Sequence, residues 1–564
     1  MKTRIHIASL TTRLFSGYCG LVPVVLALAF TTLVRMHLRD MPLERDEGEY
    51  AYTAQLLLRG ELPYAAAYTM KLPGVSLACA LAMLVFGESA EAIRILTWLV
   101  NAISILLVFL LGRRLLDAAA GAVAAVCFAF ISLSPNVLGL AAHASHFVMM
   151  FALLGALLLL RGIDTGRVLT LALSGAMFGL AFIMKQPGLV FGLFGLAYLS
   201  INKLIGGRPI GTLFKNAVVF VLGLLAPFAL ISSLLWFGGA FDKFWFWTFT
   251  YAHKYSSALS FEEGMRVFRT MLAEVTVGNL FFAILALLGA GVLWWDARLN
   301  PYRLFVIGFT LSSVTALWPG MYFRHHYFVF VAPAVALLAG VAVSRCLYLL
   351  GRDLSIELLL TPPTLVLFGA AVIYAAVIHG PVWLASSPTD ASKLIYRSSI
   401  FADSLEVARF LEQATTPSQK VAVLGSEPQI YFYSRRRAAT GHIYMYPLME
   451  THPYAAKMQE ELVRELEAAQ PEFVVFINMH TSWLRRPESE RRIFDWWTAY
   501  SKTNYMLVRV FTPTSSTGKW DPEKFLPYLL GDYSIPAQLL VRTVQPNETV
   551  PLAIHVYKRR PSAP

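Results

Sequence analysis

Cysteine and charge are both scarce in this sequence. Four cysteines occur among 564 residues, none in a C-x-x-C arrangement and none beyond Cys346. This pattern excludes a readable disulfide framework and a cysteine-based metal site. Only 15% of the residues are charged, whereas 57% are hydrophobic and the mean hydropathy is +0.57. Soluble proteins of this length rarely have so apolar a composition, so we expect a membrane protein with many spans.

The sequence also lacks internal repeats, low-complexity tracts and blocks of basic residues. Its net charge is +12, but lysines and arginines stand singly or in pairs between apolar runs. A nucleic-acid-binding protein would gather them on one stripe. We therefore expect no nucleic-acid partner and interpret the basic residues as topology signals.

Long apolar runs are what the sequence has in abundance. Those suited to a hydrocarbon core of ~30 Å cover residues 15–36, 91–112, 117–135, 143–160, 167–184, 187–202, 214–236, 277–296, 302–319, 325–347 and 361–385. They predict a polytopic α-helical membrane protein with about 11 transmembrane helices. The basic N-terminus (Lys2, Arg4, Arg13) has no clear cleavage site after its apolar run, so we expect the first span to be retained.

The distribution of basic residues predicts the orientation of the chain. Lysine and arginine in short loops favour the cytoplasmic side, and alternate loops carry Arg113 and Arg114; Arg161 and Arg167; Lys203, Arg208 and Lys215; Arg298 and Arg303; Arg345 and Arg352. We expect the protein to lie in the inner membrane, with these loops and the N-terminus on the cytoplasmic side. An odd number of spans then places loop 37–90, loop 237–276 and the C-terminal region on the periplasmic or extracellular face.

The composition changes near residue 386. Short apolar runs at 421–424, 473–477, 505–511 and 553–557 alternate with helix-like stretches at 403–413 and 457–469. We predict two domains: a transmembrane domain at 1–385, with loop 37–90 as its first external loop, and an external α/β domain at 386–564. The shorter apolar run 73–86 follows a Pro-Gly turn and predicts an interfacial helix.

Loop 37–90 contains the most unusual polar stretch, RDEGEY at residues 45–50. Asp46 with Glu49 three residues later could form an acidic capping box, and Gly60 could end the helix. However, three acids within four positions at the mouth of a membrane bundle exceed what a cap needs. Asp46 and Glu47 are therefore candidate catalytic acids, and one aspartate can serve as both base and cap.

Four cationic or basic residues near predicted external helix ends are candidates for binding a lipid phosphate. They are Lys71, Lys185, Arg324 and His326. Arginine can bind phosphate in a bidentate manner and histidine can donate to it. The alternatives are lysines that snorkel to the headgroups and a nonspecific interfacial belt. For Lys185 the snorkelling alternative explains the position equally well.

Two histidines raise the question of a metal ion. His143 and His146 are three residues apart and share a helix face. Together with Asp46 they could bind a divalent metal ion, although a pair of histidines alone is a weak signal for one.

Aromatic residues gather in loop 237–276, from Phe241 to Tyr251. They predict an amphipathic helix in the interface, or one that also flanks the entrance for a polyprenyl chain.

Together these features resemble the bacterial C-type (GT-C) membrane glycosyltransferases, which include protein O-mannosyltransferases, aminoarabinose transferases of lipid A and lipopolysaccharide sugar transferases. The resemblance rests on Asp46-Glu47 through Tyr50, Gly60, Pro63-Tyr64 and Lys71 before Pro73-Gly74, with weaker support from 179–186, 326–340 and 424–431. Tyr50 and Tyr64 are candidates for contacting a sugar or for packing the loop.

The resemblance implies transfer of a sugar from a polyprenyl-phosphate donor to a cell-envelope glycan, lipid or protein on the external face. It implies that Asp46 is the base or a metal-linked acid, and that Lys71 contacts the phosphate. Many relatives have an acid in the second external loop, where this chain has His143, Ser145 and His146. A metal site with two carboxylates is therefore not expected. With no second carboxylate placed as a nucleophile, we expect inversion at the anomeric carbon.

Two other functions remain open on the sequence. A transporter usually has polar or broken helices near the membrane midplane, often in two related halves, and neither feature is evident here. A noncatalytic protein that binds a polyprenyl glycolipid would use the same cations, so only a test for activity separates it from an enzyme.

Overall fold

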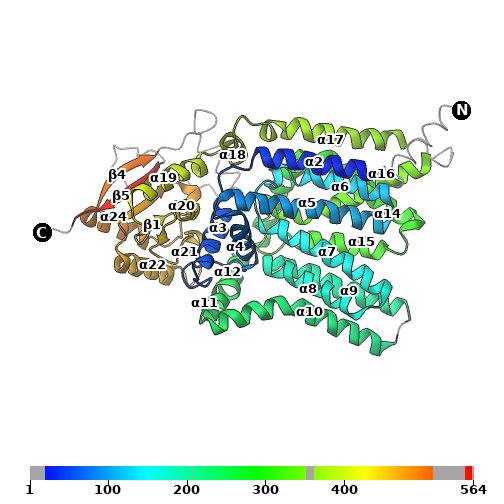
Figure 1. The fold of residues 1–564 in the computed structure, drawn as a ribbon, viewed down its shortest axis with the longest axis horizontal. Helices are drawn as coiled ribbons and strands as arrows, with labels where there is room; N and C mark the ends of the chain where they lie inside the picture. Colours follow the sequence, from blue (N-terminus) through cyan, green and yellow to red (C-terminus); the bar gives the residue numbers. More distant parts are fainter. Residues whose placement is uncertain (1–19, 208, 351–360, 512–552, 562–564) are drawn as a thin grey trace.

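The computed structural model describes residues 20–207, 209–350, 361–511 and 553–561, so the predicted topology residues Lys2, Arg4, Arg13, Arg208 and Arg352 lie outside the described residues. Figure 1 shows a bundle of long helices on one side and a small sheet with its own helices on the other. The helices α3 and α4 lie between these two parts. The segment with the candidate acids is thus at the junction between the helix bundle and the part that contains the sheet.

Every apolar run predicted as a span coincides with a helix of the bundle. These helices are α2 (Val22–His37), α5 (Ala90–Leu115), α6 (Ala118–Ile131), α7 (Ala144–Thr165), α8 (Val168–Met184), α9 (Leu189–Ile205), α10 (Ile210–Phe237), α14 (Leu280–Trp295), α15 (Arg303–Thr315), α16 (Ala332–Leu350) and α17 (Thr361–Trp383). Among the described residues, five helices are long and apolar enough to cross a membrane alone, or six if a bent pair counts as one span. The prediction of a multi-span helical membrane protein is confirmed, and the count of eleven spans stays a prediction.

Several basic loops meet at the end of the bundle away from the sheet. Arg114 at the end of α5 binds Asp164 at the end of α7. Arg298, in the 3₁₀ turn η5 (Ala297–Leu299), lies 3.3 Å from Asp117 before α6. These contacts join three of the predicted cytoplasmic loops at one end, and the membrane side on which they lie stays a prediction.

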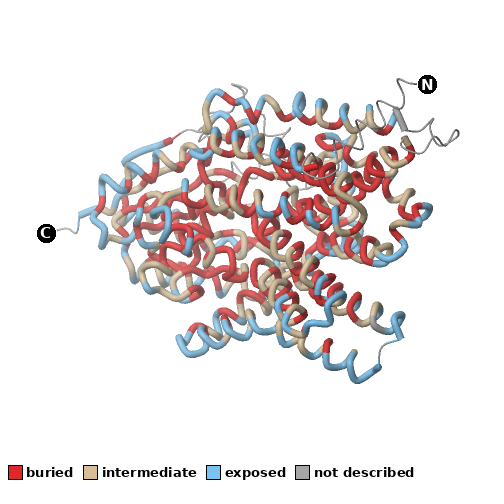
Figure 2. Tube along the Cα trace, turned by 45° about the vertical axis from the view of Figure 1, so that its right-hand side comes forward, coloured by how far each residue is buried: buried red, intermediate tan, exposed pale blue. Residues whose placement is uncertain are grey.

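The outer helices expose large apolar side chains. On α10, Phe214 is 71% exposed and Trp236 is 64% exposed. Figure 2 shows buried residues concentrated in the middle of the molecule and exposed residues along outer helices. A continuous apolar surface of this kind fits contact with lipid.

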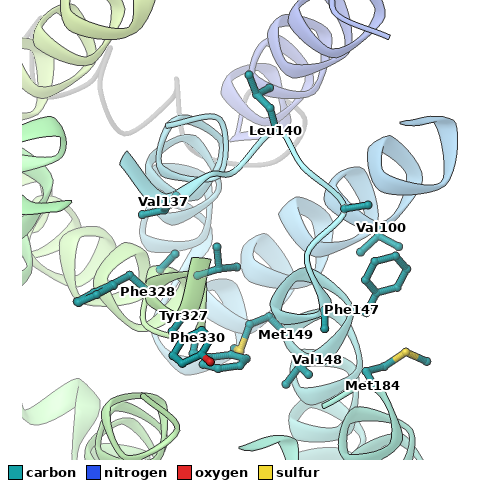
Figure 3. Packing of buried hydrophobic residues seen from close by; sticks show 14 of the residues in the cluster. Val100, Val137, Leu140, Phe147, Val148, Met149, Met184, Tyr327, Phe328 and Phe330 are labelled. Carbon is teal, nitrogen blue, oxygen red and sulfur yellow. The ribbon is translucent and has the colours of Figure 1, made fainter. Parts of the chain in front are cut away.

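Apolar packing holds the loops that carry the candidate histidines. The 3₁₀ turns η2 (Pro135–Val137) and η6 (His325–Phe330) pack near the first turns of α7. Val137, Phe147, Met149 and Phe330 are buried there (Figure 3). Burial of each such side chain contributes about 1.5–3 kcal/mol, so these loops are held as firmly as the helices beside them.

The first loop forms two helices, α3 (Arg45–Leu58) and α4 (Gly74–Phe86). Gly60 has a φ of +80° just beyond α3, as expected of a residue that ends a helix. The helix predicted at 73–86 is present as α4. Its predicted place in the membrane interface is not tested by the fold.

The aromatic segment is divided into α11 (Phe241–Trp245), the π-helix η4 (Phe246–Tyr251), α12 (Ala252–Ser256) and α13 (Phe261–Gly278). Residues 241–256 are helical without a break, and the predicted place of this helix in the membrane interface stays a prediction. Phe244 and Trp247 are buried, and the Trp247 ring stacks on Tyr68 of the first loop at 5.7 Å, whereas Trp245 is 47% exposed. Tertiary contacts therefore take up one side of this aromatic segment, and the other side is exposed.

The C-terminal region contains a five-stranded mixed sheet in the order β2-β1-β3-β5-β4. The strands are β1 (Lys420–Leu424), β2 (Arg437–Ala438), β3 (Phe473–Asn478), β4 (Tyr505–Phe511) and β5 (Ala553–Arg559). β1 pairs in parallel with β2 and β3, whereas β5 is antiparallel to β3 and β4. The helices are α18 (Pro388–Tyr396), α19 (Ile400–Ala414), α20 (Gln429–Ser434), α21 (Tyr446–Met449), α22 (Ala455–Ala469), α23 (His480–Trp483) and α24 (Arg492–Asn504). The predicted strands and helices of this region are confirmed, and the domain boundary at residue 386 stays a prediction.

Candidate active site

The helix α3 begins one residue before the candidate base. Glu44 is the N-cap: its side chain accepts from the backbone N–H of Glu47, and the Glu47 side chain accepts from the backbone N–H of Glu44. The capping box predicted from Asp46 and Glu49 is therefore wrong, because Glu44 and Glu47 fill those positions. Asp46 lies in the first turn with its carboxylate free for other contacts.

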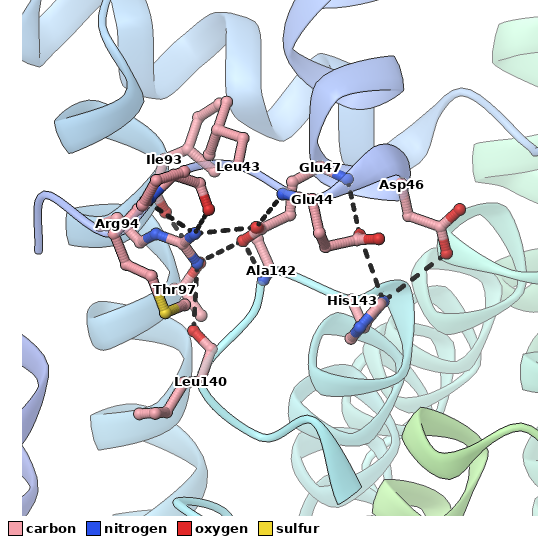
Figure 4. A network of polar contacts seen from close by, with 12 residues as sticks. Leu43, Glu44, Asp46, Glu47, Ile93, Arg94, Thr97, Leu140, Ala142 and His143 are labelled. Carbon is pink, nitrogen blue, oxygen red and sulfur yellow. Dashed lines mark hydrogen bonds and ion pairs between the residues drawn. The ribbon is translucent and has the colours of Figure 1, made fainter. Parts of the chain in front are cut away.

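Glu47 points away from Asp46 and into the bundle (Figure 4). It is fully buried and ion-paired with Arg94 in the first turn of α5. Its Oε1 also accepts from the backbone N–H of Ala142 at 2.6 Å. Both oxygens are thus occupied by protein donors, which supports a positioning role for Glu47, and its predicted catalytic role stays a prediction.

Asp46 faces a cation. Its Oδ1 lies 2.7 Å from Nζ of Lys71, and the same ammonium lies 2.6 Å from Oε2 of Glu49. Burial is the largest single effect and disfavours the charged carboxylate, but Lys71, His143 and His326 together outweigh it and hold the pKa of Asp46 well below its usual range. Asp46 is therefore ionised at neutral pH and able to accept a proton.

The surroundings of Lys71 fix its position. Glu49 also accepts a hydrogen bond from the Thr69 hydroxyl. The Tyr50 ring lies 4.4 Å from Nζ of Lys71, and the buried Tyr64 hydroxyl donates to the Lys71 carbonyl at 2.8 Å. Tyr64 thus packs the loop, whereas Tyr50 contacts the cation directly.

Three predicted residues from separate elements come together as a set of metal-type ligands. Ligand atoms of Asp46, His143 and His326 all lie within 4.8 Å of one another. The two imidazole rings are stacked at 4.0 Å, and both ring nitrogens of His143 are buried without a hydrogen-bond partner. One carboxylate and two imidazoles are a donor set that a divalent transition metal can use. These three residues, and not the predicted set with His146, are the ones that could hold an ion.

His146 does not reach this cluster. It lies in the first turn of α7, and its Nε2 is buried without a hydrogen-bond partner. The spacing of the two histidines predicted a shared helix face, but His143 is the N-cap residue just before α7 and has an extended backbone. The assumption of a shared face therefore fails at the helix terminus.

Among the described residues of the site, Lys185 and Arg324 are cations without a carboxylate in contact. Nζ of Lys185 lies 3.9 Å from the centroid of the Tyr327 ring. The Arg324 guanidinium donates to the Tyr255 hydroxyl at 3.5 Å and lies over the Tyr322 ring. The pKa of Lys185 is lowered to about 7, and burial is the largest cause. The positive charge of Arg324 nearby also lowers it. The structure therefore has two half-buried cations available for an anion.

Some residues of the site have no counterpart in the sequence-based prediction. Glu44, Glu49 and Arg94 complete the ion pairs of α3, and Tyr444 from the C-terminal region lies 5.7 Å from Nζ of Lys71. Arg94 was detectable in principle, because it is a lone charge at the start of an apolar run. Tyr444 gave no such signal.

Residues 70–237 match the family model described as dolichyl-phosphate-mannose-protein mannosyltransferase. A comparison with curated protein sequences gives no match. Among solved structures, ArnT from Cupriavidus metallidurans bound to undecaprenyl phosphate is similar with a TM-score of 0.56 and 16% identity, over 87% of this chain and 95% of that chain. The oligosaccharyltransferase AglB from Archaeoglobus fulgidus, in complex with an inhibitory peptide and a dolichol-phosphate, is similar with a TM-score of 0.53 and 12% identity, over 93% of this chain and 75% of that chain. At these identities the likeness establishes the fold.

Proposed function

We propose that this chain, which has the fold of the C-type membrane glycosyltransferases, moves a sugar from a polyprenyl-phosphate donor to an acceptor. The observation that carries the proposal is the ion pair of Asp46 and Lys71 at 2.7 Å, beside two cations without a carboxylate partner. The family match over residues 70–237 supports the same reaction class. A base and a cationic phosphate site are the two parts that this transfer needs.

Asp46 is proposed as the general base. Its low pKa, set mainly by Lys71 against the effect of burial, keeps it ionised to accept the proton of the acceptor hydroxyl or amine. The acceptor's oxygen or nitrogen then forms the new bond to the anomeric carbon as the bond to the phosphate oxygen breaks. A single displacement of this kind inverts the anomeric centre.

Lys185 and Arg324 are proposed to bind the donor phosphate. Negative charge gathers on the phosphate as the sugar leaves, and buried cations stabilise that charge more strongly than cations in water. Lys71 is already bound by Asp46 and Glu49, so we propose that it mainly keeps Asp46 ionised. His326 and Lys185 both lie within electrostatic reach of Asp46, which supports a base and a phosphate site that adjoin each other.

The site is proposed to face the outside of the cell. The basic loops gather at the opposite end of the bundle, which supports an inner-membrane protein with its N-terminus in the cytoplasm. The acceptor would then be a glycan, lipid or protein of the cell envelope.

A glycan analysis with a base variant tests the proposal. We expect cells without this protein to lack one sugar in an envelope glycan, glycolipid or glycoprotein, as measured by mass spectrometry. The wild-type protein should restore the sugar, and Asp46→Asn should not, because an amide is not a base. Asp495→Asn, an exposed position on α24, is the matched control and should restore it.

Equal restoration by Asp46→Asn and wild type would remove Asp46 as the base. Loss of the protein with no change in any envelope glycan would favour a transporter or a noncatalytic glycolipid-binding protein. Membrane levels of each variant, measured by immunoblot, show that the comparison is between folded proteins.

A further inference from the structure

We infer that the C-terminal region positions the base, through an ion pair between Glu427 and Arg45, the residue just before Asp46. This inference rests on the proposed role of Asp46. It makes Glu427 and Arg45 positioning residues of the transfer reaction, although Glu427 lies far along the chain beyond β1.

The ion pair is largely buried, with the Arg45 side chain 15% exposed. Nη2 of Arg45 lies 2.6 Å from Oε1 of Glu427, and Nε donates to the same oxygen at 2.9 Å. Nε also donates to the Ser426 carbonyl at 3.1 Å. The other oxygen of Glu427 accepts from the Gln429 side chain at 2.8 Å, and Glu427 is fully buried. Arg45 is thus held in one orientation.

Backbone packing brings the two regions together at the same place. A Cβ added to Gly48 would lie 2.6 Å from the backbone nitrogen of Gln429, which is closer than real Cβ atoms approach. A glycine inside a helix costs about 1 kcal/mol relative to alanine. Here it allows the first turn of α20 to contact α3 directly, two residues after Asp46.

The first turn of α3 is therefore held from two sides. Arg45 is bound by the C-terminal region, and Glu47 is bound by Arg94 of the bundle. Asp46 lies between them and projects toward His143 (Figure 4), and its Oδ1 lies 2.7 Å from Nζ of Lys71. Because successive helix residues point in directions about 100° apart, fixing residues 45 and 47 also fixes the direction of the Asp46 side chain.

A second ion pair between the same two regions provides a matched control. Arg437 of β2 lies 2.7 Å from Glu61, beyond the end of α3, and its side chain is 48% exposed. It joins the C-terminal region to the first loop but has no contact with the first turn of α3. If the Glu427 pair only helped to dock the two regions, the two pairs would behave alike.

The test uses the full-length protein in vesicles with a lipid extract that contains polyprenyl-phosphate sugars, and measures release of polyprenyl phosphate. For Glu427→Gln we expect kcat to fall roughly 10- to 100-fold, because a small displacement of a base is costly, with the donor KM changed by no more than about twofold. Arg437→Gln should leave both constants unchanged. Arg45→Lys keeps the charge without the fork geometry and should show a smaller fall in kcat.

Arg45→Lys also serves as the second variant if Glu427→Gln does not fold, as judged by its melting temperature. Unchanged kcat in the folded variants, or an equal fall in Arg437→Gln, would overturn the inference. The failure of the proposed function is distinguishable, because Asp46→Asn would then keep its turnover. An inactive Asp46→Asn together with a fully active Glu427→Gln would overturn the positioning role alone.

Discussion

At the scale of single residues, the site depends on how each charge is partnered. Lys71 contacts two carboxylates, whereas Lys185 and Arg324 have aromatic neighbours and a tyrosine hydroxyl. A buried cation without a counter-ion is costly, so such residues commonly mark a binding site for an anion. On this basis Lys71 is the residue that keeps Asp46 ionised, and Lys185 and Arg324 are the residues that would bind phosphate.

Donor binding should depend on pH through Lys185. Its pKa is lowered to about 7, first by burial, so it is charged below that pH and neutral above it. A phosphodiester stays anionic throughout this range. We expect the donor KM to rise as the pH increases through about 7. Lys185→Arg keeps its charge and should remove this dependence, and the same rise in that variant would contradict the assignment.

Lys71→Met should act mainly on the base. The ammonium opposes the effect of burial on Asp46, so its removal should raise the pKa of that carboxyl group. We expect the acidic limb of the pH–kcat profile to move to higher pH. A higher donor KM with an unmoved acidic limb would instead support the phosphate contact that the family resemblance implies for Lys71.

The sequence predicted part of the site because Asp46 and Lys71 lie in one loop. A short loop between two apolar runs has few ways to keep charged residues apart. Convergence of His143 with His326 could not be predicted, because it depends on how α7 and η6 pack. The ion pair of Glu47 could not be predicted for the same reason, since its partner Arg94 lies beyond the loop on α5.

At the scale of elements, α3 is the part on which the account depends. Its capping box, its pairing to α5 and its contact with α20 hold a helix that has polar residues throughout its first turn. The periodic pattern and Gly60 were sufficient to predict the helix. They did not predict its N-cap, because Glu44 and Asp46 are both suitable acceptors and tertiary contacts decide between them.

Glu47→Gln should destabilise the protein. The substitution leaves the Arg94 guanidinium buried without its carboxylate, a loss of roughly 3–5 kcal/mol. We expect a lower melting temperature of the detergent-solubilised protein. Glu91 lies on α5, the helix that carries Arg94. Glu91→Gln breaks an exposed contact with Arg39 and should change the melting temperature little. Equal stability of Glu47→Gln and Glu91→Gln would contradict the positioning role of Glu47.

At the scale of the whole molecule, the architecture follows from composition and periodicity. Apolar runs predicted the bundle helices, and alternating segments predicted the strands of the C-terminal sheet. The junction between them was beyond sequence reasoning, because the ion pairs that form it join residues from opposite ends of the chain, as with Arg45 and Glu427. The candidate site lies at this junction, where α3 meets both parts.

The most direct measurement is the conversion of a polyprenyl-phosphate sugar by the purified protein. Vesicles with wild-type or Asp46→Asn protein would be incubated with donor lipids and envelope extract, and the lipids followed by mass spectrometry. The account predicts that wild-type protein converts a sugar-bearing polyprenyl phosphate to free polyprenyl phosphate, and that Asp46→Asn does not. Equal conversion by both proteins, or none by wild type with donor and acceptor present, would contradict it.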